Sequence, residues 1–108
     1  MRNKFTDHLK SPLTEWTIEY RVHATRRMFQ RDIDEADILS LLETGIVIDE
    51  YSEDYPFPSV LVNGRGRNAR ALHAVVGIDS QSHRLYLITT YEPDPDKWDN
   101  DFSRRTSQ

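Results

Sequence analysis

The chain has 108 residues and a formal net charge of −4, with 37% apolar and 30% charged residues. This length supports one domain with one modest core, and the acidic balance argues against a generic nucleic-acid binder with a basic surface. The sequence has no cysteine and no apolar run near the roughly 20 residues that span a bilayer, so we expect a cytoplasmic protein without disulfides or thiolate metal sites.

Charge alternates in blocks along the chain. Residues 20–31 carry four arginines and no acid, and residues 32–54 carry nine acids and no base. Residues 59–91 carry four arginines and one acid, and residues 92–101 carry five acids and one lysine. The two basic blocks can converge on one face, although solvated faces that neutralise one another are the plainer alternative.

Residues 22–31 are predicted to form a helix with one polar and one apolar side. His23, Arg27 and Arg31 are spaced by four residues and therefore lie in a row on the polar side. Such a row can face a ligand or simply face water, and the spacing alone does not distinguish the two. The apolar side is expected to be buried and consists of Val22, Ala24, Thr25, Met28 and Phe29.

Residues 33–44 are predicted to form a second helix with a sharp beginning and end. Asp34 can cap its first turn, because its carboxylate can accept a hydrogen bond from a free backbone N–H. Gly45 suits a left-handed position just beyond the last turn. Residues 46–48 are rich in β-branched side chains and are expected to follow at once as a strand.

Residues 59–63 are predicted to form a further short strand that ends in a glycine-rich turn. Residues 63–68 are expected to need positive φ angles at glycine, as hairpin turns often do. The turn carries Arg65 and Arg67. It lacks the Lys-Ser/Thr ending of a phosphate-binding loop, and no helix pattern follows it.

Residues 70–93 are predicted to form the central antiparallel hairpin, with residues 80–83 as its loop. If Asp79 faces Arg84, alternation assigns each side chain to one face. The expected core face is Leu72, Ala74, Val76, Ile78, Leu85, Leu87, Thr89 and Tyr91. The expected far face is His73, Val75, Gly77, Tyr86, Ile88 and Thr90, which places His73 opposite Thr90.

These elements predict an α+β domain over residues 15–98. Two N-terminal helices should pack on one face of a mainly antiparallel sheet of about four strands, because the connections between the strands are short. Residues 15–20 alternate as in a short strand or an extended lead-in. Residues 1–14 are expected to form a flexible arm and residues 99–108 a flexible tail, because both are polar and show no clear period.

Four phrases within residues 22–98 resemble a small bacterial family called domain of unknown function 4258. They are HATRRMFQRDI, DILSLLETGIVIDEY, PFPSVLVNGRGRNARALHAVV and ITTYEPDPDKW. The resemblance implies a fold similar to the RelE/MqsR-like toxins. It also implies an mRNA-cleaving ribonuclease that is paired with an antitoxin protein, as in toxin–antitoxin systems with a zinc-finger antitoxin of the YgiT type.

The residue types fit a ribonuclease that needs neither metal nor cofactor. Histidine suits the proton transfers, arginine binds the phosphate, and tyrosine can donate a proton or stack on a base. The expected substrate is single-stranded RNA, free or on the ribosome. The candidate catalytic residues are His23, Arg27, Arg31 and His73. The candidate substrate-binding residues are Arg65, Arg67, Tyr86 and Tyr91.

A non-enzymatic protein-interaction module is the alternative function. It would bind a partner at the exposed sheet edge or along the acidic and aromatic stretch EYSEDYPFP. The position of the histidines separates the two functions, because an enzyme needs His23 and His73 in one cleft with the arginines. A buried His73, or two distant histidines, would favour the interaction module.

Overall fold

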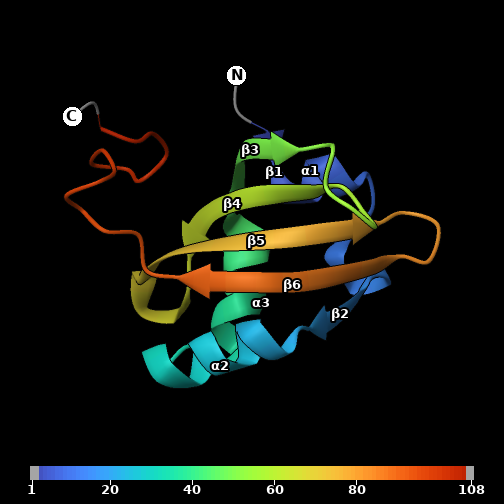
Figure 1. Cartoon of the computed structure of the whole chain (residues 1–108), viewed down its shortest axis with the longest axis horizontal. Helices are drawn as coiled ribbons and strands as arrows, with labels where there is room; N and C mark the ends of the chain where they lie inside the picture. The colour runs from blue at the N-terminus through green and yellow to red at the C-terminus, as the bar shows by residue number, and fades with distance from the viewer. Residues whose placement is uncertain (1–2, 107–108) are drawn as a thin grey trace.

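The computed structural model describes residues 3–106, which build a six-stranded sheet with the order β1-β3-β4-β5-β6-β2 (Figure 1). The strands are β1 (Asn3–Lys4), β2 (Thr17–Tyr20), β3 (Ile46–Tyr51), β4 (Ser59–Arg65), β5 (Ala71–Asp79) and β6 (Arg84–Tyr91). Neighbouring strands are antiparallel except for β2 and β6, which are parallel. The expected antiparallel character of the sheet is therefore confirmed.

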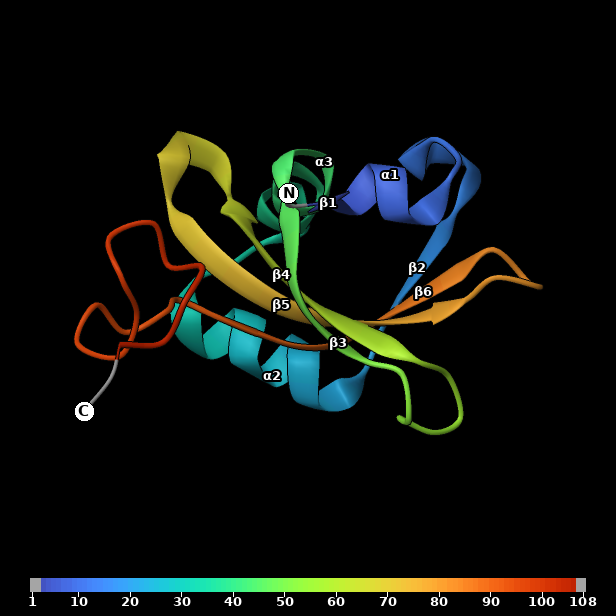
Figure 2. The same cartoon turned by 90° about the horizontal axis from the view of Figure 1, so that it is seen from above.

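The helices are α1 (Phe5–Leu9), α2 (Val22–Arg31) and α3 (Glu35–Thr44). Helices α1 and α3 lie on one side of the sheet, whereas α2 runs along its β6 edge (Figures 1 and 2). The mixed α+β class agrees with the sequence, but the expected two helices on one face and four strands match only roughly. None of the helices within residues 3–106 is long and apolar enough to cross a membrane.

The core lies between the sheet and the side that carries α1 and α3. Alternate residues of β5 and β6 enter it, as the sequence predicts near the hairpin loop, and pack with the apolar stripe of α3. Burying each such aliphatic side chain contributes about 1.5–3 kcal/mol relative to leaving it in water. These residues are Leu72, Ala74, Val76, Ile78, Leu85 and Leu87 of the strands, and Ile38, Leu41 and Leu42 of α3.

The expected N-terminal arm is part of the packed domain over its described residues. Phe5, Leu9 and Leu13 are buried in the same core, and β1 pairs with β3 at the edge of the sheet. The sequence did not indicate this because α1 is only five residues long and shows no full period. Residues 1, 2, 107 and 108 of the expected arm and tail lie outside the described residues.

Helix α2 buries only part of its apolar side. Ala24 is fully buried and Met28 is half-buried, but Phe29 is 90% exposed and Val22 is 68% exposed. The expectation that this whole side would be covered is therefore wrong, because a helix along a sheet edge is covered over a narrower arc. The exposed ring of Phe29 points away from the domain core.

Both ends of α2 are fastened to the sheet by hydrogen bonds. The backbone N–H of Arg21 donates to the Leu87 carbonyl at 3.1 Å. At the other end, the Arg70 guanidinium donates to the carbonyls of Arg31 and Asp32, and its Nε lies 3.0 Å from the Glu92 carboxylate. Arg70 therefore satisfies carbonyls that the end of a helix leaves free, and it fixes the position of the α2 side chains.

The start of α3 is tied to the turn that follows β4. Asp34 and Asp37 form a capping box, and the Arg67 backbone N–H donates to Asp37 Oδ1 at 2.8 Å. The Arg67 guanidinium also pairs with the Asp34 carboxylate. Burial alone would raise the pKa of Asp37, but the hydrogen bonds from the Asp34 and Arg67 backbone N–H groups and the Arg67 charge lower it overall.

The glycines near this turn are needed for close approach rather than for positive φ. A Cβ at Gly66 would lie 2.7 Å from Leu72 Cδ1 and 2.9 Å from Asp37 Oδ1. The positive φ angles of the turn belong instead to Asn68 and Ala69, at 62° and 58°. Gly45 is also extended, with φ of −76°, so the predicted left-handed conformation is wrong at both places.

Replacing Asp37 with asparagine should destabilise the fold. One of the two carboxylate oxygens becomes an N–H donor facing a backbone N–H, so we expect a loss of about 1–3 kcal/mol in the free energy of unfolding. Because folding lowers the pKa of Asp37, its stabilisation is present above its usual pKa of 3.8 and is lost as pH falls through the lowered value. Urea unfolding of both proteins across this pH range measures the difference.

The matched control is Glu43→Gln, an exposed position of the same helix. Its stability should follow that of the wild type. A difference between wild type and Asp37→Asn that stays constant down to the lowest pH would contradict the assigned role of the carboxylate.

Candidate functional site

Polar and aromatic side chains gather on the face of β5 and β6 that is turned away from the core, called the front face below. On β5 the residues of the front face are His73, Val75 and Gly77, which alternate with the core residues. On β6 the paired positions are Tyr91, Thr89 and Tyr86. The front face has one open end at Tyr86 and one closed end at His73.

A β-bulge at Ile88 corrects the predicted pairing of the hairpin. Asp79 pairs with Arg84 as expected, but β6 contains an extra residue between Leu87 and Thr89. Beyond the bulge His73 lies opposite Tyr91 instead of Thr90, and Thr90 enters the core, where it is fully buried. Tyr91 was therefore assigned to the wrong face: its side chain belongs to the front face beside His73.

His73 is fully buried and hydrogen-bonded at both ring nitrogens. Its Nε2 lies 2.7 Å from the Phe102 carbonyl, and its Nδ1 lies 3.4 Å from the Tyr91 hydroxyl. A carbonyl can only accept, so Nε2 carries the proton. The edge-on ring of Trp98 lies 4.5 Å from the imidazole, centroid to centroid. Burial lowers the pKa of His73, and the charge of Arg105 acts in the same direction.

Residues 93–106, called the C-terminal strap below, cover this histidine. Trp98 and Ser103 of the strap are buried, and the Asn63 side chain donates to the Asp101 carbonyl at 2.8 Å. The strap lies at the end of the sheet where β4 ends and β5 begins (Figure 1). Residues 99–106 are thus packed against the domain, so its described boundary extends beyond the expected residue 98.

The predicted catalytic residues are not brought into one cleft. His23 is exposed in the first turn of α2, where the chain contacts Leu87, whereas His73 pairs with Tyr91. These positions are roughly 13 Å apart along β6, at about 3.3 Å per residue. No hydrogen bond, ion pair or ring contact within residues 3–106 links His73 to the row of His23, Arg27 and Arg31.

A stacked cation and two rings occupy the open end of the front face. The Arg21 guanidinium lies 4.6 Å from the centroid of the Tyr86 ring. Phe57 stacks on the same tyrosine with ring centroids 5.3 Å apart and planes 4° apart. A hollow of about 180 Å³ beside them is also lined by Asp54, Tyr55, Pro56, Gly77 and Ile88, and the Asp54 carboxylate accepts from the Ser59 hydroxyl. Tyr55 is 93% exposed, so an exposed aromatic ring lies at the rim of this hollow.

The two arginines of the turn after β4 have partners within the chain. Arg67 is held by the carboxylates that cap α3. Arg65 donates to the Ala69 carbonyl at 3.3 Å, and its guanidinium lies 6.0 Å from the centroid of the Phe102 ring. Arg67 therefore has a structural role, whereas Arg65 lies near the strap that closes the front face.

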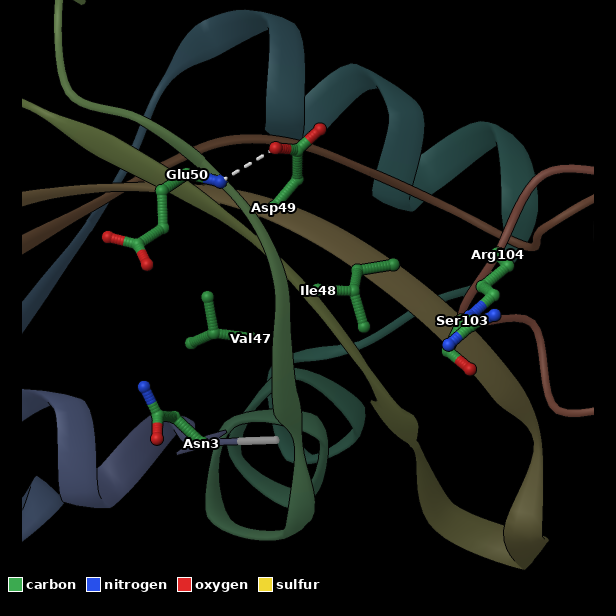
Figure 3. Close-up of a pocket in the computed structure, with 7 residues that line it drawn as sticks. All are labelled: Asn3, Val47, Ile48, Asp49, Glu50, Ser103 and Arg104. Atoms are coloured by element: carbon green, nitrogen blue, oxygen red, sulfur yellow. Dashed lines mark hydrogen bonds between the residues drawn. The ribbon is translucent and has the colours of Figure 1, made fainter. Parts of the chain in front are cut away.

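A hollow of about 500 Å³ lies between β3 and the strap. Figure 3 shows Asp49 and Glu50 of β3 on one side of it and Ser103 and Arg104 on the other. The Asp49 carboxylate accepts from the Glu50 backbone N–H at 2.9 Å. The exposed carboxylates of Asp49 and Glu50 suit a cationic ligand in this hollow rather than a phosphate. Among the described residues, no group of three or more His, Cys, Asp or Glu is placed to hold a metal ion.

Sequence reasoning missed Arg21, Phe57, Trp98 and Phe102. Arg21 and Tyr86 are far apart in the sequence, so only the parallel pairing of β2 with β6 brings them together. Phe57 lies between two prolines in a stretch that predicts a loop. The sequence did not indicate that Trp98 and Phe102 pack on the sheet, because the residues around them are mostly charged.

The family model described as "Domain of unknown function (DUF4258)" matches residues 20–92. The matched region begins just before α2, ends just after β6, and stops before the C-terminal strap. No curated protein and no solved structure matched the chain. Because the family model covers more than half of the sequence, the chain belongs to the DUF4258 family.

Proposed function

We propose that this protein binds single-stranded RNA at the open end of its front face and cleaves it without a metal ion. The observation that carries the proposal is the stacked group of Arg21, Tyr86 and Phe57 beside an open hollow. Proteins hold unpaired bases on aromatic rings and the backbone with nearby cations, which is the combination found here.

Arg21 lines this hollow, and the other three arginines of the first basic block follow along α2. Within residues 3–106, Arg21, Arg26, Arg27 and Arg31 form no ion pair with a carboxylate. Arg67, Arg70 and Arg84, by contrast, do form such pairs. The positive charge of the first basic block is therefore local and free, although the whole chain is acidic.

In the proposed reaction His23 takes the proton of the ribose 2′-hydroxyl. The 2′-oxygen attacks phosphorus, the bond to the 5′-oxygen breaks, and that oxygen takes a proton from water. His23 is exposed and two residues from Arg21, so the base that Tyr86 stacks and the reacting phosphate can lie side by side. Arg27 and Arg31 follow on the same helix and are assigned to the phosphate.

The toxin–antitoxin setting is part of this proposal. It comes from the resemblance of the sequence phrases to the DUF4258 family, whose fold plan is similar to that of RelE/MqsR-like toxins. It adds a cytoplasmic location, an antitoxin partner and RNA on the ribosome as a second form of the substrate. The family description itself assigns no activity.

A protein-interaction module is the second candidate function, and the outer edge of β3 favours it. β1 pairs with β3 only at Ile46 and Val47, so the rest of this edge has no strand beside it within the described residues. An extended peptide can add a strand to such an edge. The buried His73, separated from His23, also fits a module better than a two-histidine catalytic site.

Replacing Tyr86 with alanine should weaken RNA binding by about 1–3 kcal/mol, the value of one base stacked on an aromatic ring. Fluorescence anisotropy with a labelled oligouridine at fixed salt measures the affinity. Phe29→Ala is the matched control, because this exposed ring of α2 does not line the hollow, and it should bind like the wild type. Equal loss in both variants would contradict a stacking role for Tyr86.

Replacing His23 with alanine should lower RNA cleavage by at least about a hundredfold, the scale of a lost acid–base group. The assay uses purified full-length protein with a chelator present, and Gln30→Ala on the same helix is the control. Cleavage that disappears with the chelator, or that survives in His23→Ala, would refute the proposed chemistry. Binding without any cleavage would support the proposed RNA binding and contradict the proposed cleavage.

A further inference from the structure

A second group of ligand-binding side chains lies at the closed end of the front face. His73 and Tyr91 face the same side of adjacent strands, and Asn63 pairs with His73 on β4. Arg65 follows two residues later on the same strand. An imidazole, a phenol, an amide and a guanidinium are the side chains that hold bases and phosphates at RNA-binding surfaces.

The C-terminal strap contacts each of these side chains except Tyr91 through a ring or a carbonyl. The Phe102 carbonyl accepts from His73, and the Asp101 carbonyl accepts from Asn63. The Trp98 ring packs edge-on against the imidazole, and the Phe102 ring lies near the Arg65 guanidinium. Rings and acceptor oxygens thus occupy the positions that the bases and oxygens of a bound nucleotide would take.

The strap is closed by its own hydrogen bonds. The Thr106 N–H donates to the Lys97 carbonyl at 3.0 Å, and the Asp99 N–H donates to the Arg104 carbonyl at 2.8 Å. Hollows of about 500 Å³ and about 300 Å³ border it. Trp98 is outside the main core cluster. The strap can therefore leave as one unit without opening the core.

We propose that the closed end is a second nucleotide subsite and that the C-terminal strap is an intramolecular competitor for it. The inference rests on the proposed binding of RNA at the open end, which is roughly 13 Å away along β5 at about 3.3 Å per residue. In the closed form the strap blocks the subsite. The competition is steric rather than electrostatic, because residues 93–106 carry four acids and three bases and are nearly neutral overall.

The competition sets the size of the expected effect. A ligand that binds only the open form has an apparent dissociation constant equal to the intrinsic value divided by the open fraction. A strap that is closed most of the time therefore weakens RNA binding by the inverse of that fraction. Removing one of its two ring contacts should raise the open fraction and strengthen binding by at least about fivefold.

The test compares full-length Trp98→Ala and Phe102→Ala with wild type, and with Asn100→Ala as a control at an exposed position of the same strap. Anisotropy with labelled oligouridine measures affinity, and an NMR titration of the His73 imidazole reports whether the strap has opened. The expected result is tighter binding in both ring variants, a His73 pKa that rises toward the usual value near about 6.5, and no change in Asn100→Ala.

Two results would overturn the inference. In one, the His73 pKa rises but the affinity for oligouridine is unchanged, so the freed side chains do not bind RNA. In the other, both variants fold and the His73 pKa stays low, so the rings do not hold the strap. If wild type binds and Tyr86→Ala loses binding, either result removes the second subsite alone. If neither the wild type nor any variant binds RNA, the proposed function itself is refuted, and the second subsite with it.

Discussion

The β-bulge at Ile88 decides which side chains share the front face. Without the extra residue, Tyr91 would enter the core and Thr90 would lie beside His73. With it, the phenol and the imidazole meet on one side, and the small threonine fills the core position, where its hydroxyl donates to the His73 carbonyl at 2.8 Å. The pairing of the phenol with the imidazole at the closed end follows from this single register shift.

The front face combines an open and a closed end within one pair of strands. At the open end the residues before α2 bring Arg21 over Tyr86, because β2 runs parallel to β6 and its last residue lies beside Leu87. At the closed end a segment beyond the family match covers His73. The matched region thus supplies strands β3 to β6 and the α2 row, and the strap that covers His73 lies outside it.

Local signals predicted α2 and α3 well but not the five-residue α1, and long-range packing accounts for the differences. The bounds of α2 and the Asp34 cap of α3 follow from periodicity and capping chemistry, which are encoded within a few residues. The sequence did not indicate the bulge in β6, because this strand consists of good strand formers on both faces. The exposure of Phe29 depends on α2 lying at a sheet edge, which its own sequence does not specify.

The central claim is that RNA binds the front face at the Arg21–Tyr86 stack. Mapping backbone amide chemical shifts in the labelled full-length protein during addition of oligouridine tests it most directly. The account predicts the largest changes at Gly77, Tyr86 and the first turn of α2, with smaller changes toward His73. Shifts confined to Asp49 and Glu50 on the β3 edge, or no shifts at all, would contradict it and favour a protein-interaction module.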